Sequence, residues 1–189
     1  LCTDKAGDEH RRPEPSIGYS LGINATKFIL VMKTYIGIDN GVSGTIAVLS
    51  PSGNHFGKIP TKKEQDYTKA KKNITRLDYG QFKAILEPYR GEDVIVVMER
   101  PMVNPTRFLA SASALRCHEA ELICIEELCL PLRYIDSKEW QRNMLPKGAD
   151  DLKKASLDIG NRLFPNFKDY KHLDRDSLLI AEYARQKNL

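Results

Sequence analysis

The chain has 189 residues, of which 41% are hydrophobic and 29% charged, and its net charge is +4. This length and balance are typical of a soluble globular domain with a sizeable core, rather than of a disordered chain. No apolar stretch approaches the roughly 20 residues of a membrane-spanning helix, so we expect no membrane partner. The four cysteines show no zinc-binding spacing. Reduced thiols of this kind favour a cytoplasmic protein.

Residues 1–31 differ from the rest of the chain, because they combine prolines and mixed charges with no sustained hydrophobic periodicity. The first confident strand follows Met32 at once, which suggests that Met32 is the native start and that 1–31 is a disordered or non-native leader. The apolar stretch 28–31 is too short for a signal peptide, so we expect no secretion. Residues 32–189 are then expected to form one domain.

From Met32 onward, apolar runs and turn signals alternate in a readable order. They predict strands over residues 34–39, 45–49, 54–60, 93–99 and 132–135. They predict helices over 77–89, 105–128, 136–145, 150–163 and 175–187, and Asp136 with Glu139 forms a capping-box pattern. Residues 58–76 are interpreted as a basic loop. The order implies an α/β fold with a mixed five-stranded sheet, three antiparallel strands then parallel strands, and helices on both faces.

Three carboxylates stand where a buried strand ends or a helix begins. Asp39 ends the first strand, Glu99 ends the fourth, and Asp176 opens the last helix. An unpaired charge at the end of a buried strand is strongly disfavoured, so these acids need a partner. Mg²⁺ takes carboxylate oxygens as ligands and leaves positions open for phosphate and water. Plainer interpretations remain open, namely a turn residue, an ion-pair partner of an arginine and a first-turn acid on a helix.

The segments that carry these acids resemble a known family. Gly37–Gly41, Val97–Pro101 and Asp176–Ala181 resemble, in this order, the metal-ligand segments of the RuvC-type Holliday-junction resolvases. The resemblance spans about 33–187. It implies a ribonuclease-H-like fold, a catalytic site with two Mg²⁺ ions (Mn²⁺ as a substitute) and symmetric hydrolysis of four-way DNA junctions by a homodimer. It also implies that the helix 105–128 forms the dimer surface. A compact enzyme of this type suits a bacterial, phage or plasmid setting.

The chain departs from the family pattern in two places. Asn40 stands where the family usually has proline. The position three residues before the last acid, which the family fills with an acid or histidine, is Leu173, which cannot bind a metal. Asp174 and His172 are therefore the candidates for the fourth ligand, and we favour Asp174 as a catalytic metal ligand. On a regular helix Asp174 would point about 200° away from Asp176, so it reaches the site only if the helix begins late. Its other interpretation is an N-cap.

Basic residues gather in the predicted loop and in the later helices. Seven lysines and arginines lie between Lys58 and Arg76. Lysine and arginine beside a nucleic-acid backbone gain affinity through counterion release, although a solvated surface is the simpler interpretation. The candidate DNA-binding residues are Lys62, Lys63, Lys69, Lys71, Lys72, Lys138, Arg142, Lys147, Lys153 and Lys154.

Together these features predict a metal-dependent, structure-selective endonuclease that resolves four-way DNA junctions. One alternative is a nuclease of the same fold that acts on RNA, as in ribosomal-RNA processing. Another is a catalytically silent nucleic-acid-binding module, which the apolar Leu173 favours. The segment Ile36–Gly44 also resembles the phosphate loop of actin-type and sugar-kinase-type ATPases. Those enzymes need a second, duplicated domain, for which this chain is too short.

Overall fold

The structure of the protein, a computed structural model, describes residues 33–189. The predicted leader, residues 1–31, and the proposed start at Met32 lie outside the described residues. The strands are β1 (Thr34–Asp39), β2 (Thr45–Ser50), β3 (Gly53–Lys58), β4 (Thr61–Gln65), β5 (Asn73–Leu77), β6 (Val94–Glu99) and β7 (Leu132–Ile135). The α-helices are α1 (Tyr79–Leu86), α2 (Phe108–Glu127), α3 (Ser137–Met144), α4 (Leu152–Leu163) and α5 (Asp176–Lys187). Short 3-10 turns occupy Glu87–Tyr89, Pro105–Arg107 and Pro165–Phe167. None of the described helices is long and apolar enough to cross a membrane.

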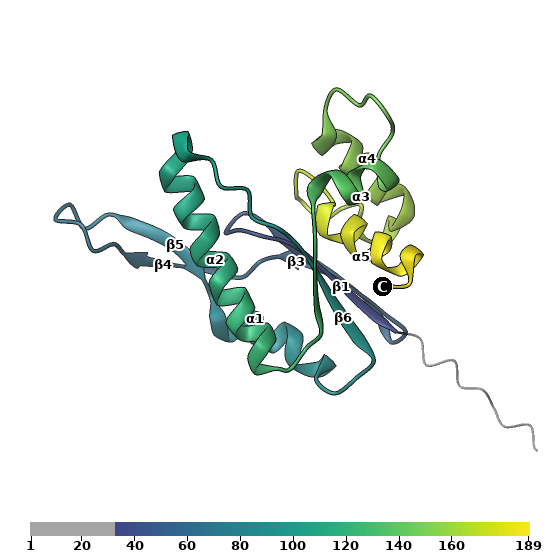
Figure 1. Cartoon of the computed structure of the whole chain (residues 1–189), viewed down its shortest axis with the longest axis horizontal. Helices are drawn as coiled ribbons and strands as arrows, with labels where there is room; N and C mark the ends of the chain where they lie inside the picture. Colours follow the sequence, from purple (N-terminus) through teal and green to yellow (C-terminus); the bar gives the residue numbers. More distant parts are fainter. Residues whose placement is uncertain (1–32) are drawn as a thin grey trace, which may run out of the picture. The chain divides into compact units, whose positions relative to one another are not determined.

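The main sheet has the strand order β3-β2-β1-β6-β7 (Figure 1). β1, β2 and β3 pair antiparallel, whereas β6 and β7 join β1 in parallel, which confirms the predicted mixed five-stranded sheet. Ile38 of β1 lies opposite Met98 of β6. The two strands are parallel and in register. Asp39 and Glu99, their last residues, therefore lie at the same end of the sheet. This end is a natural site position in such sheets.

Helices cover both faces of the sheet, as Figure 1 shows for α1 and α2 on one side and α3, α4 and α5 on the other. Ile36 and Ile38 of β1 pack with Phe82 of α1 in one buried cluster. Tyr35 belongs to the second cluster, with Leu178 of α5. Successive residues of a strand point to opposite faces, so each strand of the centre must be apolar throughout. The sequences of β1 and β6 are unbroken apolar runs because both faces of these strands are buried.

Gly37 allows α5 to approach β1 unusually closely. A Cβ atom at this position would lie 2.7 Å from the backbone nitrogen of Ala181 and closer still to the carbonyl oxygen of Ser177. Only glycine leaves room for such a contact between a strand and a helix backbone. The contact fixes the first turn of α5, and with it Asp176, over the end of β1.

The prediction of a loop over residues 58–76 is wrong, because most of this segment forms a β-hairpin. β4 and β5 pair antiparallel as a separate two-stranded sheet. The paired segments are mostly polar and lack the apolar alternation that identifies a strand from the sequence. Glu64 of β4 forms ion pairs with Lys62, at 3.0 Å, and with Arg76 of β5, at 2.5 Å.

Two predicted helix starts also differ in detail. α2 begins at Phe108, after the 3-10 turn that Asn104 caps by accepting a hydrogen bond of 3.0 Å from the Thr106 backbone nitrogen. Asp136 stands at the N-cap of α3, but its side chain makes no capping bond. Glu139, the other member of the predicted capping box, instead accepts a bond of 2.9 Å from the Tyr183 hydroxyl. Glu139 therefore contacts α5 in place of the backbone at the start of its own helix.

Candidate metal centre

Three of the predicted acids meet beyond the end of β1. Carboxylate oxygens of Asp39, Asp174 and Asp176 all lie within 4.8 Å of one another. Asp39 comes from the end of β1, Asp174 from the segment before α5, and Asp176 from the first residue of that helix. Carboxylates crowded in this way repel one another, unless a cation lies among them.

Asp174 reaches this cluster because α5 begins late. The helix starts at Asp176, and Arg175 before it has non-helical backbone angles, φ −131° and ψ 30°. Asp174 therefore lies outside the helix, and its side chain need not point about 200° away from that of Asp176. Asp174 is buried and forms an ion pair of 3.2 Å with Lys153 of α4. His172, the other candidate, lies beside Asp174, with 3.3 Å between Nδ1 and Oδ1, and is not among the three clustered side chains.

Arg175 fixes the segment that carries Asp174. Its side chain is fully buried, and the guanidinium donates hydrogen bonds of 2.9 Å to the backbone carbonyl oxygens of Phe167, Tyr170 and Asp174. Gly160 of α4 makes room for it, because a Cβ there would lie 2.6 Å from Arg175 Cγ. Sequence reasoning missed this residue, since an arginine between two aspartates normally indicates a solvated surface.

A serine on the neighbouring helix orients Asp176. The Ser156 hydroxyl of α4 donates a hydrogen bond to Asp176 Oδ1 and accepts one of 3.1 Å from the Arg175 backbone nitrogen. Ser156 is fully buried. A buried serine in an amphipathic helix carries no sequence signal for such a role, so it was not predicted.

Glu99 lies at the same site but outside the tight cluster. Its carboxylate accepts hydrogen bonds from the Ser137 hydroxyl and, at 2.8 Å, from Trp140 Nε1, both on α3. These donors hold the two oxygens of Glu99 in fixed directions. Glu99 also raises the pKa of Asp39 and of Asp176 by charge repulsion, so its charge acts on the same centre.

The electrostatics of the centre favour a bound cation. Burial, followed by repulsion from Asp176, Glu99 and Asp174, raises the pKa of Asp39 well above its usual value. Burial likewise raises the pKa of Asp176 to about 6, against the opposing hydrogen bond from Ser156. Lys153 offsets only part of the negative charge. A buried, all-oxygen donor set of this kind fits Mg²⁺ or Mn²⁺.

The predicted DNA-binding residues are all exposed but occupy different places. Those on the β4–β5 hairpin are Lys62, Lys63, Lys69, Lys71 and Lys72, and those on α3, α4 and the segment between them are Lys138, Arg142, Lys147, Lys153 and Lys154. Of these, Lys153 contacts an acid of the centre. Lys153 also lines a cavity of about 750 Å³ together with Lys58, Lys171 and His172. Lys58 and Lys171 were not among the predicted contacts, because the cavity brings together segments far apart in the chain.

Comparison with known proteins identifies the fold. No protein-family model matches the sequence, and no curated protein sequence matches it. Among solved structures, Thermus thermophilus RuvC in complex with a Holliday-junction substrate aligns with a TM-score of 0.51 and 11% identity, over 82% of this chain and 96% of that chain. A second Thermus thermophilus RuvC structure has a TM-score of 0.47 and 15% identity over the same shares. The alignment with a TM-score of 0.51 shows that the chain has a RuvC-like, ribonuclease-H-like fold, as predicted.

Proposed function

We propose that this protein is a metal-dependent endonuclease that cuts four-way DNA junctions. The observation that carries the proposal is the convergence of Asp39, Asp174 and Asp176 within 4.8 Å. The raised pKa values of Asp39 and Asp176 mean that a cation would stabilise their ionised forms. Metal-bound carboxylate clusters are a recurring means of hydrolysing phosphodiesters. The RuvC-like fold makes junction DNA the substrate to test first, because one aligned structure holds a Holliday junction.

Each acid has a separate task in this proposal. Asp39, Asp174 and Asp176 supply oxygen ligands, and Glu99 supplies a further one from the end of the neighbouring strand, β6. Two Mg²⁺ ions, or Mn²⁺ in their place, would provide the activated water and the charge stabilisation that hydrolysis requires. Lys153 pairs with Asp174, at 3.2 Å, and offsets part of the negative charge of the cluster.

The exposed lysines give the substrate backbone a place to bind. The 750 Å³ cavity beside the centre is lined by Lys58, Lys153 and Lys171, and it opens next to Ser43 of the turn after β1. Positive side chains along such a cavity attract phosphates and position them without reading base sequence. The remaining predicted lysines, on the hairpin and on α3, would extend this contact over a branched substrate.

A homodimer is the proposed working form. Phe108 and Leu109 at the start of α2 are 73% and 81% exposed, and Leu115 continues the apolar surface along the helix. Large apolar side chains exposed together indicate a protein interface. A two-fold dimer through this helix would present two metal centres, one for each of two strands of a junction.

The decisive experiment is cleavage of a labelled synthetic four-way junction with Mg²⁺. The wild-type chain is compared with Asp39→Asn and with Asp158→Asn, which removes an exposed carboxylate elsewhere on α4. We expect paired nicks from the wild type and from Asp158→Asn, and none from Asp39→Asn. Linear duplex and an RNA/DNA hybrid serve as controls. Cutting of the hybrid alone would assign an RNA substrate, and junction binding that ignores Mg²⁺ without any cutting would assign a silent binding module.

A further inference from the structure

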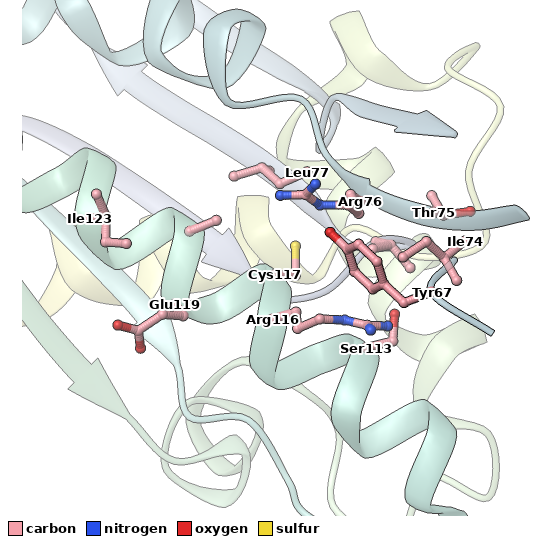
Figure 2. Close-up of a pocket in the computed structure, with 12 residues that line it drawn as sticks. Tyr67, Ile74, Thr75, Arg76, Leu77, Ser113, Arg116, Cys117, Glu119 and Ile123 are labelled. Atoms are coloured by element: carbon pink, nitrogen blue, oxygen red, sulfur yellow. The ribbon is translucent and has the colours of Figure 1, made fainter. Parts of the chain in front are cut away.

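A second cavity lies away from the metal centre, between the β4–β5 hairpin and α2. Its volume is about 310 Å³, at the small end of the range for small-molecule sites. Val42, Ile74, Leu77 and Ile123 supply its apolar walls. Figure 2 shows the side chains of the hairpin and of α2 around this space. A cavity of this size and lining suits one flat, partly apolar group.

An aromatic side chain borders this cavity without being packed into the core. Tyr67, in the turn of the hairpin, is 95% exposed, so the faces of its ring are open. The turn itself is ordered, because the Asp66 backbone nitrogen donates a bond of 2.7 Å to the Lys72 carbonyl oxygen. Asp66 Oδ1 also accepts bonds of 3.1 and 2.6 Å from the Thr68 backbone nitrogen and hydroxyl. These hydrogen bonds hold the turn that carries Tyr67.

The charges around the cavity are mostly positive. Arg76 of β5 and Arg116 of α2 line it with Tyr67, as Figure 2 shows, and Glu119 is the acid among the lining residues. Arg76 is paired with Glu64, whereas Arg116 is exposed and forms no ion pair within residues 33–189. Guanidinium groups stack on flat rings and bind phosphate. An aromatic ring, two arginines and neighbouring lysines together match a nucleotide.

This cavity also lies near the metal centre. Val42 lines both the 310 Å³ cavity and the basic 750 Å³ cavity that contains Lys153. The same residue follows Asp39 by three positions in the chain. A DNA strand that passes the metal centre can therefore reach both cavities within a short length.

We propose that the cavity between the hairpin and α2 receives one unpaired base of the branched DNA, which stacks on Tyr67 while Arg116 binds its phosphate. The inference rests on the proposed function for its class of substrate. In this proposal the hairpin does more than attract phosphates through its positive charge. It also binds a nucleotide that has left the helical stack. A stretch of intact duplex does not offer such a base.

The test measures DNA affinity by fluorescence anisotropy in EDTA, so that no cutting takes place. Three DNAs are compared at one salt concentration: a paired duplex, the same duplex with one unpaired base, and that duplex with the unpaired position made abasic. For the wild type we expect about 10-fold tighter binding of the unpaired base, in the range of one base–aromatic stack. Tyr67→Ala should lose this preference and keep its affinity for paired duplex. Tyr67→Trp should retain the preference, and Arg116→Gln should reduce it.

The abasic DNA completes a double-mutant cycle. Wild type and Tyr67→Ala should bind it equally, because the stacking partner is already gone. Equal weakening of all three DNAs by Tyr67→Ala, or no change at all, would overturn the inference, as would failure to bind any of them. Metal-dependent nicking together with a DNA preference that does not depend on Tyr67 would remove this inference alone. A Tyr67-dependent preference without nicking would remove the proposed nuclease function alone.

Discussion

Gly37 of β1 lies against the backbone of Ala181 in α5, so closely that an added Cβ would be 2.7 Å from the Ala181 nitrogen. This contact brings Asp176, at the start of the same helix, to the end of the strand that carries Asp39. The position of the proposed metal centre therefore depends on Gly37, which is not one of the residues that would bind the ion.

Gly37→Ala should destabilise the protein and weaken metal binding together. The new methyl group meets backbone atoms that cannot move aside individually, and such overpacking costs on the order of 1–3 kcal/mol or more. Chemical denaturation measures the stability, and a Mn²⁺ titration measures the site. Gly80→Ala in α1 is the matched control, because the nearest atom to its Cβ would be 3.8 Å away. Alanine there should raise stability by up to about 1 kcal/mol. Unchanged metal affinity in Gly37→Ala would show that α5 can shift without moving Asp176.

Asp39→Asn should stabilise the protein when no metal is present. The folded-state pKa of Asp39 is raised, so its ionised form at neutral pH costs folding free energy. Removing that charge should raise the free energy of unfolding by on the order of 1–3 kcal/mol at pH 7. The gain should shrink as the pH falls toward about 4 and vanish below it, because the carboxyl is then protonated in both states.

The same variant predicts the response to metal. Mg²⁺ should raise the melting temperature of the wild type, because a ligand that binds only the folded state stabilises it. Asp39→Asn should show little or no such increase. Melting curves with EDTA and with Mg²⁺ at several pH values test both parts. If Asp39→Asn is less stable than the wild type without metal, the crowding of charges is not the dominant feature of this site.

Trp140 should report metal binding through its fluorescence. It is the only tryptophan of the chain, and its indole nitrogen donates a bond of 2.8 Å to Glu99. A cation bound by the Glu99 carboxylate changes the electric field at the indole. We therefore expect a saturable change in Trp140 emission on titration with Mg²⁺. Glu99→Gln should abolish the change, whereas Glu92→Gln, in the exposed loop before β6, should preserve it.

Trp140→Phe separates positioning from packing at the same residue. Phenylalanine keeps most of the buried surface but removes the donor, and a hydrogen bond to a charged group contributes about 1.5–3 kcal/mol. We expect the Mg²⁺ concentration for half-maximal cleavage to rise more than the maximal rate falls. An unchanged Mg²⁺ requirement would mean that Ser137 alone orients Glu99.

Glu121→Gln should stabilise the protein increasingly as the pH rises. Glu121 is fully buried in α2, where it accepts a bond of 3.3 Å from Cys117 Sγ, and burial raises its pKa to about 8. The folded state therefore holds a proton that the unfolded state releases above its pKa of about 4.3. Wild-type stability should fall between that pKa and pH 8, and glutamine should remove most of this loss, on the order of 2–4 kcal/mol at pH 8. Denaturation at pH 5 and pH 8 measures the difference. A difference of the same size at both pH values would exclude titration of Glu121 as its cause.

The sheet could be predicted from the sequence, and so could Asp39 and Glu99 at the ends of its strands, because each rests on a local pattern. β1 and β6 are covered on both faces, which requires the unbroken apolar runs that the sequence shows. An acid that directly follows such a run is conspicuous. Asp39 and Glu99 could be placed for this reason, and the parallel pairing of the two strands then brought them to one edge.

The rest of the site depends on contacts between distant parts of the chain. Whether Asp174 faces the centre was ambiguous, because it is decided by where α5 begins, and Arg175 sets that start through bonds to carbonyl oxygens. Ser156 and Trp140 orient acids that lie far from them in sequence. The hairpin escaped prediction because its strands, β4 and β5, are mostly polar and lack apolar alternation.

The chain order of the four acids has a consequence during synthesis. Asp39 and Glu99 leave the ribosome with the sheet, whereas Asp174 and Asp176 follow only with the last helix. On the proposed function, a nascent or truncated polypeptide can complete its sheet and still lack half of the ligands. On the proposed function, the segment that contains Asp174 and α5 is therefore required before the protein can bind its full set of metal ions.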